Sequence, residues 1–198
     1  AGAVSAFAEG TADDTTKGTL LSDGQPITTG GTYRLSGPYT KAIKINTSES
    51  VTINIAAGDE VTFQPEEHAG PYVLLDVVTN SDLTVNNNGV YNGPTFLYIS
   101  TNSANAKVTI NGGRYNITKQ PNVETCAFDF EVGGSDENPI VVDGVYIETG
   151  LDCTGIEACG APKVMIKNST INVLDTGYTG GGAINIVDSR VDRDPLVI

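Results

Sequence analysis

Three acidic side chains have a spacing that could bind a metal ion. Asp129 and Glu131 alternate with apolar residues, so both point outward from one predicted strand, about 7 Å apart by strand rise. Asp76 occupies a comparable position in an earlier predicted strand, residues 73–77. Carboxylate oxygens are the ligands that Ca²⁺ takes. These residues are therefore candidates for a calcium site, with three separate solvated carboxylates as the alternative.

Three tyrosines could bind a carbohydrate. Tyr91, Tyr115 and Tyr146 follow successive corners of the sequence, each two residues past a glycine. A row of rings that points outward would form a strip for stacking against sugar rings, whereas a row that points inward would fill the core. The sequence leaves both alternatives open and favours core filling.

The cysteines suggest a disulfide. Cys153 and Cys159 enclose five residues, a loop short enough to be closed by a bridge in an oxidising compartment. Cys126 and Cys153 are a rival pair, because they lie about one sequence repeat apart. The spacing alone does not choose between the two pairings.

Residues with catalytic potential do not converge in the sequence. The single histidine, His68, lies in a proline-bounded loop beside two glutamates, and Arg193 lies between two aspartates near the end. A second acidic cluster, Glu148, Asp152 and Glu157, is also loosely spaced. A carboxylate pair for glycoside hydrolysis must stand about 5 to 10 Å apart. We therefore assign no catalytic residue and expect binding rather than catalysis.

A repeated corner must position these side chains. Runs of alternating apolar and polar residues meet at an Asn, Asp or Gly followed by a small residue, a combination that tolerates a left-handed backbone. The central apolar residues before the five corners are Val85, Ile110, Val142, Ile166 and Ile186, at steps of 25, 32, 24 and 20 residues. A period in the twenties with variable insertions is typical of a parallel β-solenoid.

The pattern predicts an all-β fold, a right-handed parallel β-helix over residues 31–198. Residues 1–30 are expected to be an irregular lead-in or cap, in which Ala6, Phe7 and Ala8 match the cleavage spacing of a secretory signal remnant. A β-sandwich is the alternative, because its short strands also alternate. The domain could be part of a longer surface protein.

The amino-acid composition limits the classes of partner that the protein could bind. The formal net charge is −13, from 11 basic and 24 acidic residues, which disfavours nucleic acid and anionic membrane surfaces. No run approaches the roughly 18 apolar residues of a membrane span. Abundant glycine, absent tryptophan and an 18% content of charged residues suit a secreted β-rich protein.

Two stretches resemble known proteins. Residues 30–37, which read Gly-Gly-Thr-Tyr-Arg-Leu-Ser-Gly, and the following strands to residue 63 resemble the start of secreted bacterial carbohydrate-binding modules. The corners over residues 72–192, and residues 179–186 above all, resemble right-handed β-helix proteins of the pectate-lyase-like superfamily and bacterial surface adhesins. The resemblance implies a secreted or cell-surface module for adhesion or carbohydrate binding, with an extracellular glycan or host surface as partner. A polysaccharide lyase or glycoside hydrolase and a structural stalk are the alternatives.

Overall fold

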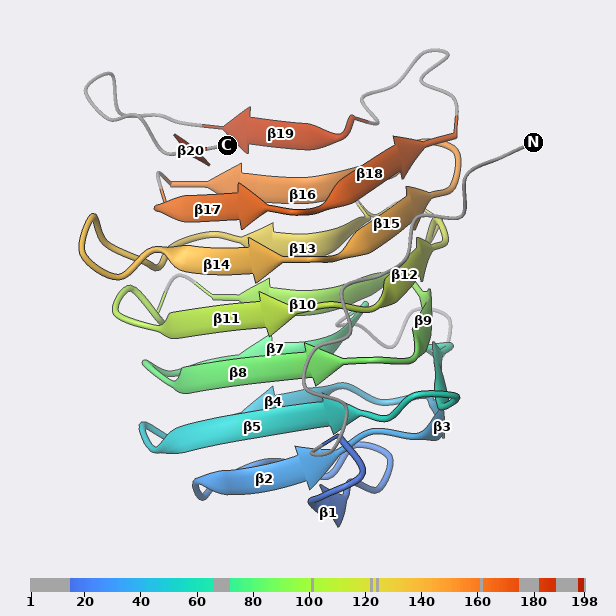
Figure 1. Ribbon diagram of the computed structural model, residues 1–198, viewed down its shortest axis with the longest axis vertical. Coiled ribbons are helices and arrows are strands. Elements are labelled where there is room, and N and C mark those ends of the chain that lie inside the picture. Colours follow the sequence, from blue (N-terminus) through green and yellow to red (C-terminus); the bar gives the residue numbers. More distant parts are fainter. Residues whose placement is uncertain are drawn as a thin grey trace.

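The protein is built of short strands that form three sheets, which are the three walls of the molecule (Figure 1). The computed structural model describes residues 15–65, 72–100, 102–121, 123, 125–160, 162–174, 182–187 and 196–197. Within these ranges all paired strands run parallel. The same ranges contain no helix long and apolar enough to cross a membrane.

Each wall is one parallel sheet, named here A, B or C. The strands of sheet A are β1 (Thr19–Leu20), β2 (Gly31–Arg34), β5 (Ser50–Ile55), β8 (Asp82–Asn87), β11 (Lys107–Asn111), β14 (Ile140–Asp143), β17 (Val164–Lys167) and β20 (Leu196–Val197). Those of sheet C are β3 (Gly37–Tyr39), β6 (Glu60–Phe63), β9 (Val90–Gly93), β12 (Arg114–Ile117), β15 (Tyr146–Thr149) and β18 (Thr170–Val173). Those of sheet B are β4 (Ile43–Ile45), β7 (Val73–Val77), β10 (Thr95–Ile99), β13 (Cys126–Phe130), β16 (Thr154–Cys159) and β19 (Ile184–Val187).

The chain visits the walls in the order A, C, B, and then begins the next coil. In Figure 1 the strands of sheet A run left to right in front and those of sheet B run right to left behind, while the chain climbs. This path is a right-handed parallel β-helix, as predicted. The sandwich alternative is wrong, because a sandwich requires antiparallel neighbours.

The corner between sheets A and C forms a column, as the sequence predicted. Val85, Ile110, Val142 and Ile166 are in register on neighbouring strands and are buried. The corners after the last three of them adopt the left-handed backbone, with φ of 68° at Gly112, 66° at Gly144 and 52° at Asn168. The amide of Gly112 also donates to the Asp143 carbonyl at 2.8 Å, which ties one corner to the next.

The fifth corner was misplaced. Ile186 lies in β19 of sheet B, in register with Ala158 rather than with Ile166. A strand that alternates apolar and polar residues looks the same on any wall of a solenoid, so the apparent step of 20 residues joined positions on two different sheets.

Side-chain amides run along the outside of sheet A. Asn86 Nδ2 donates to Asn54 Oδ1 at 3.1 Å, and Asn111 Nδ2 donates to Asn86 Oδ1 at 3.0 Å. Both bonds join positions that the ladder pairs. These side-chain amides thus form a ladder along the outer face of sheet A.

We expect Asn86→Ala to lower the free energy of unfolding by about 1 kcal/mol, because it removes the central member of this ladder and both of its bonds. Urea denaturation followed by circular dichroism measures the change. Asn172→Ala, at an exposed position on sheet C, is the control and should change stability by less than about 0.5 kcal/mol. An equal effect in the two variants would contradict a stabilising role for the ladder.

The described part of the lead-in, residues 15–30, covers the N-terminal end of the β-helix. Strand β1 pairs with β2, and Ile27 forms an isolated bridge to Ile45. Leu21 and Ile27 are buried, while Leu20 is exposed. The segment therefore protects the first coil's apolar interior, the expected function of a cap.

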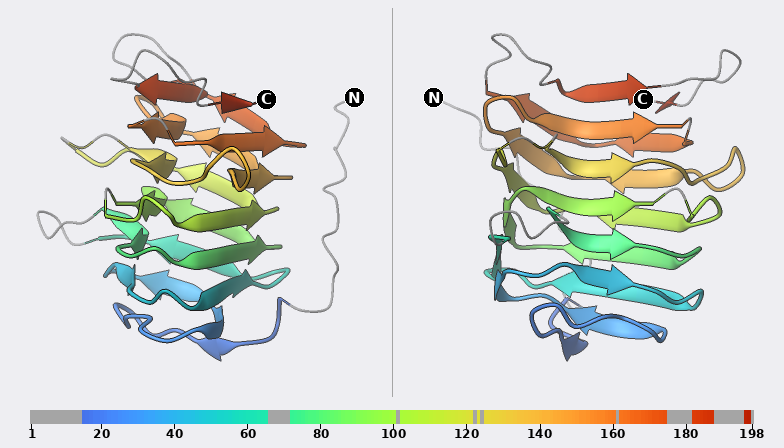
Figure 2. Two further views of the ribbon diagram at one scale, coloured as in Figure 1. Left: turned by 90° about the vertical axis from the view of Figure 1, so that its left-hand side faces the viewer. Right: turned by 180° about the vertical axis from the view of Figure 1, so that it is seen from behind.

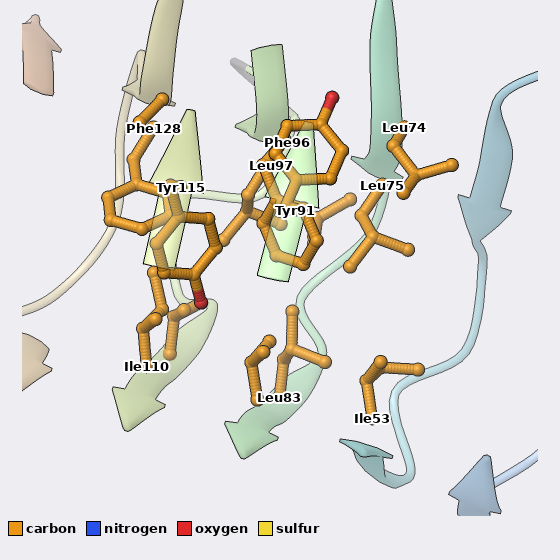
Figure 3. Close-up of a cluster of buried hydrophobic side chains, with 14 of the residues drawn as sticks. Ile53, Leu74, Leu75, Leu83, Tyr91, Phe96, Leu97, Ile110, Tyr115 and Phe128 are labelled. Carbon is orange, nitrogen blue, oxygen red and sulfur yellow. The ribbon is translucent and has the colours of Figure 1, made fainter. Parts of the chain in front are cut away.

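Aromatic rings fill the middle of the core (Figure 3). Tyr91 and Phe96 meet edge to face with centroids 4.9 Å apart, and Phe96 meets Tyr115 in the same way at 5.1 Å. Tyr115 in turn meets Phe128 at 5.0 Å. Edge-to-face pairs contribute about 0.5–1.5 kcal/mol each beyond the area they bury, so this stack joins the coils that contribute it.

Candidate functional site

The outer face of sheet C carries several polar groups that could bind a ligand. Strand register places Arg114 between Val90 and Tyr146, and Asn116 between Asn92 and Glu148. Alternate residues of each strand are buried, so these side chains point outward. We call the following six residues the sheet C face: Glu60, Asn92, Arg114, Asn116, Tyr146 and Glu148.

Hydrogen bonds connect this face across four coils. Asn92 Nδ2 donates to Glu60 Oε1 at 2.6 Å, and Asn116 Nδ2 donates to Asn92 Oδ1 at 2.7 Å. Arg114 Nε then donates to Asn116 Oδ1 at 2.8 Å. Each amide is therefore held in one orientation, and its remaining donor and acceptor capacity points in a fixed direction.

Arg114 is held by two neighbours on β15. Its Nη2 forms an ion pair with Glu148 Oε2 at 3.1 Å, and its guanidinium carbon lies 4.8 Å from the centroid of the Tyr146 ring. The Tyr146 hydroxyl donates to the same Glu148 oxygen at 3.3 Å. The Arg114 and Glu148 side chains are 40% and 30% exposed, so the pair adds little stability, and its main effect is to orient groups that solvent or a ligand can reach.

A groove of about 450 Å³ borders the sheet C face. It is lined by Gly58, Asp59 and Gly89 of the corner, and by Glu60, Asn92, Arg114 and Asn116 among others. A Cβ at Gly89 would collide with the Asp59 carbonyl oxygen, so the corner packs tightly only around glycine. Small-molecule sites are commonly of this volume, and here hydrogen-bonding groups line the rim.

The three candidate tyrosines divide between the core and the surface. Tyr91 and Tyr115 are fully buried and pack against Phe96 and Phe128 (Figure 3), so they fill the core and present no ring to a sugar. Tyr146 instead pairs with Arg114, one position away from that row, and is partly exposed.

The position of the glycine within each corner explains why Tyr146 points outward while Tyr91 and Tyr115 point inward. Gly89 and Gly113 are the second residues of their corners, whereas Gly144 is the first residue of its corner and Val145 is the second. Tyr146 therefore opens its strand, while the other two tyrosines take the second, inward position.

The carboxylates proposed for calcium share the outer face of sheet B but do not form a compact cage. Asp76 and Asp129 are separated by the intervening strand, where Tyr98 takes the position between them. Asp129 and Glu131 are on one side of that strand. Within the described residues, no group of three or more His, Cys, Asp or Glu side chains is placed to hold a metal ion. Calcium binding thus gains no support from this arrangement.

The predicted disulfide between Cys153 and Cys159 is wrong. The residues between them form strand β16 rather than a loop, and an extended strand separates the two Cα atoms by about 20 Å. A disulfide needs Cα atoms within about 7 Å. Cys126 is in register with Thr154, which places it beside Cys153 on the next coil, yet none of the three cysteines is bridged.

Other residues of the sequence analysis lie elsewhere. His68, Arg193 and its two flanking aspartates fall outside the described residues. Of the second acidic cluster, Glu148 belongs to the sheet C face, while Glu157 lies on sheet B and Asp152 follows β15 in a turn. The cluster therefore does not form a single site.

Sequence reasoning missed most of the sheet C face. One signal was available: Tyr91-Asn92 and Tyr115-Asn116 repeat the same dipeptide after the corner, with the tyrosine inward and the asparagine outward.

No protein-family profile, no curated protein and no solved structure matches the chain.

Proposed function

We propose that this protein is a secreted or cell-surface β-helix module that binds a neutral glycan on the sheet C face. The observation that carries the proposal is the hydrogen-bonded row of amide, carboxylate and guanidinium groups, with the Tyr146 ring at one end and the groove of about 450 Å³ alongside. Oriented amides and carboxylates recognise hydroxyl groups, and an aromatic ring recognises the apolar face of a sugar. The resemblance of residues 30–63 to carbohydrate-binding modules supports the same choice.

The charges of the face favour a neutral ligand. Its one guanidinium, on Arg114, already forms an ion pair with Glu148. Glu60 adds a second carboxylate to the face, and Asp59 adds another at the edge of the groove. A polyanionic glycan would therefore meet net repulsion.

Binding without turnover fits the spacing of the acidic groups. Glu60 on β6 and Glu148 on β15 are three strands apart in sheet C and offset by two positions along it, so their Cα atoms are about 16 Å apart. Glycosidase carboxylates stand about 5 to 10 Å apart. The guanidinium of Arg114 offers N–H donors and no acceptor, so it contributes hydrogen bonds to a ligand.

A glycan array, followed by calorimetry on the best ligand, tests the proposal. Reducing-sugar and unsaturated-product assays on the same polymers, with calcium and with chelator, are run in parallel. Binding without product supports a binding module, and product release would establish the lyase or hydrolase alternative. If no glycan bound and no product formed in any assay, a structural stalk would be favoured.

We expect Tyr146→Ala to weaken binding of that glycan about tenfold, because a stacked ring contributes about 0.5–1.5 kcal/mol and also holds Arg114 in place. Thr109→Ala, on the outer face of sheet A, is the matched control and should leave the affinity unchanged. If both variants bound the glycan as tightly as the parent does, the glycan site would not be on the sheet C face.

A further inference from the structure

The outer face of sheet B carries a second, chemically different surface. Register aligns Asp76, Tyr98, Asp129 and Glu157 on four successive strands. Glu131 lies two residues after Asp129 and points the same way. This wall is nearest the viewer in the right-hand view of Figure 2. We call these five residues the sheet B patch.

The carboxylates of the sheet B patch act on the Tyr98 hydroxyl. Burial raises the pKa of the Tyr98 hydroxyl, and the negative charges of Glu131, Asp129 and Asp76 raise it further. Cys159 Sγ donates to Glu157 Oε1 at 3.4 Å. Burial and that bond raise the pKa of the Cys159 thiol to about 12. Three carboxylates, those of Asp76, Asp129 and Glu131, thus act on the Tyr98 ring, and Lys44 lies beside Asp76 on the neighbouring strand β4.

One carboxylate oxygen of Asp76 makes no hydrogen bond within the described part of the chain. The residue is only 8% exposed, and its Oδ1 atom is buried with no hydrogen-bond partner among the described residues. Burial raises its pKa and outweighs the opposing effect of Lys44. A buried acceptor without a partner costs about 1–3 kcal/mol, so a ligand that donates to this oxygen recovers a contact that folding leaves unmade.

The spacing places an aromatic ring between two carboxylates. Asp76 and Asp129 are two strands apart, about 10 Å between Cα atoms. The Tyr98 ring occupies the position between them. An ammonium group is attracted to an aromatic face within about 6 Å of its centroid and donates three hydrogen bonds. That chemistry fits a ring with a carboxylate on each side.

We propose that the sheet B patch binds a glycan bearing free amino groups, with one sugar ammonium seated over Tyr98 between Asp76 and Asp129. The sugar ring would lie against Tyr98, and its ammonium would donate to Asp76 Oδ1. The choice of a glycan as the carrier of the ammonium rests on the proposed function. The excess of carboxylates over lysine in the patch provides the charge complementarity.

Isothermal titration of the intact chain with a glucosamine tetrasaccharide at pH 6 tests the inference, with the fully N-acetylated tetrasaccharide as the neutral counterpart. The amino form should bind at least tenfold more tightly than the N-acetylated form. Asp76→Asn and Tyr98→Leu should each weaken binding of the amino form at least fivefold. Tyr146→Ala, on sheet C, should leave it unchanged.

Asp82→Asn is the matched control for charge. It removes one exposed carboxylate from sheet A and so changes the net charge as much as Asp76→Asn does. Equal losses in these two variants, or equal affinity for the amino and N-acetylated sugars, would overturn the inference. Failure of every neutral glycan, with selective amino-sugar binding retained at sheet B, would contradict the sheet C proposal alone.

Discussion

Replacing Phe128 with alanine is expected to lower the free energy of unfolding by about 3 to 5 kcal/mol, which is within the range for large core aromatics. Phe128 is fully buried, edge-on to Tyr115 at 5.0 Å and stacked with Phe130 at 6.2 Å. Truncation removes both contacts and leaves a cavity in a solenoid whose rigid ladders cannot close around it. Guanidinium denaturation, followed by circular dichroism, measures the loss.

Tyr146→Ala is the matched control for Phe128→Ala, because it also truncates an aromatic on a strand but on the outer face. It should cost no more than about 1 kcal/mol. A Phe128→Ala variant as stable as Tyr146→Ala would mean that the ring stack does not support the coils.

The fold was predictable because a solenoid repeats its local rule. A corner needs a residue that tolerates the left-handed backbone, and the sequence supplies Gly112, Gly144 and Asn168 at that point of successive coils. The apolar residue before the corner must then point inward. Ile186 shows the limit of this reasoning, since alternation identifies a strand without identifying its wall.

The candidate site was less predictable because its contacts cross coils of different length. Asn116 and Asn92 are 24 residues apart in sequence, whereas Arg114 and Glu148 are 34 apart. Insertions between walls change the separation without changing the register, so no fixed spacing in the sequence identifies the partners. The disulfide prediction failed for a related reason: a short sequence separation was taken as a loop where the chain is extended.

The sheet B patch makes a separate prediction about stability. Asp76→Asn is expected to raise the free energy of unfolding by about 2 kcal/mol at pH 7, because it replaces a buried charge, whose Oδ1 has no hydrogen-bond partner among the described residues, with a neutral amide. Binding residues that cost stability are a common outcome of selection for function. The same variant should bind amino sugar less well, so any loss of binding cannot be a loss of folding.

The pH dependence of this effect has a definite sign. Burial raises the pKa of Asp76 above its ordinary value of 3.8, so the folded protein holds that proton more tightly than the unfolded chain. Below pH 3.8 the carboxyl is protonated in both states and carries no charge penalty. That penalty grows as pH rises through the folded pKa and is complete above it. The advantage of Asp76→Asn should therefore be largest at pH 7 and should shrink toward zero at pH 3.

Urea denaturation of parent and variant at both pH values measures this difference, with Asp82→Asn as the control for a carboxylate that is exposed. The control should differ from the parent by less than about 0.5 kcal/mol at either pH. A destabilised Asp76→Asn at pH 7, or a gain that persists unchanged at pH 3, would show that the Asp76 carboxylate is satisfied in the folded protein. Oδ1 would then have no unmet hydrogen bond to offer a ligand ammonium.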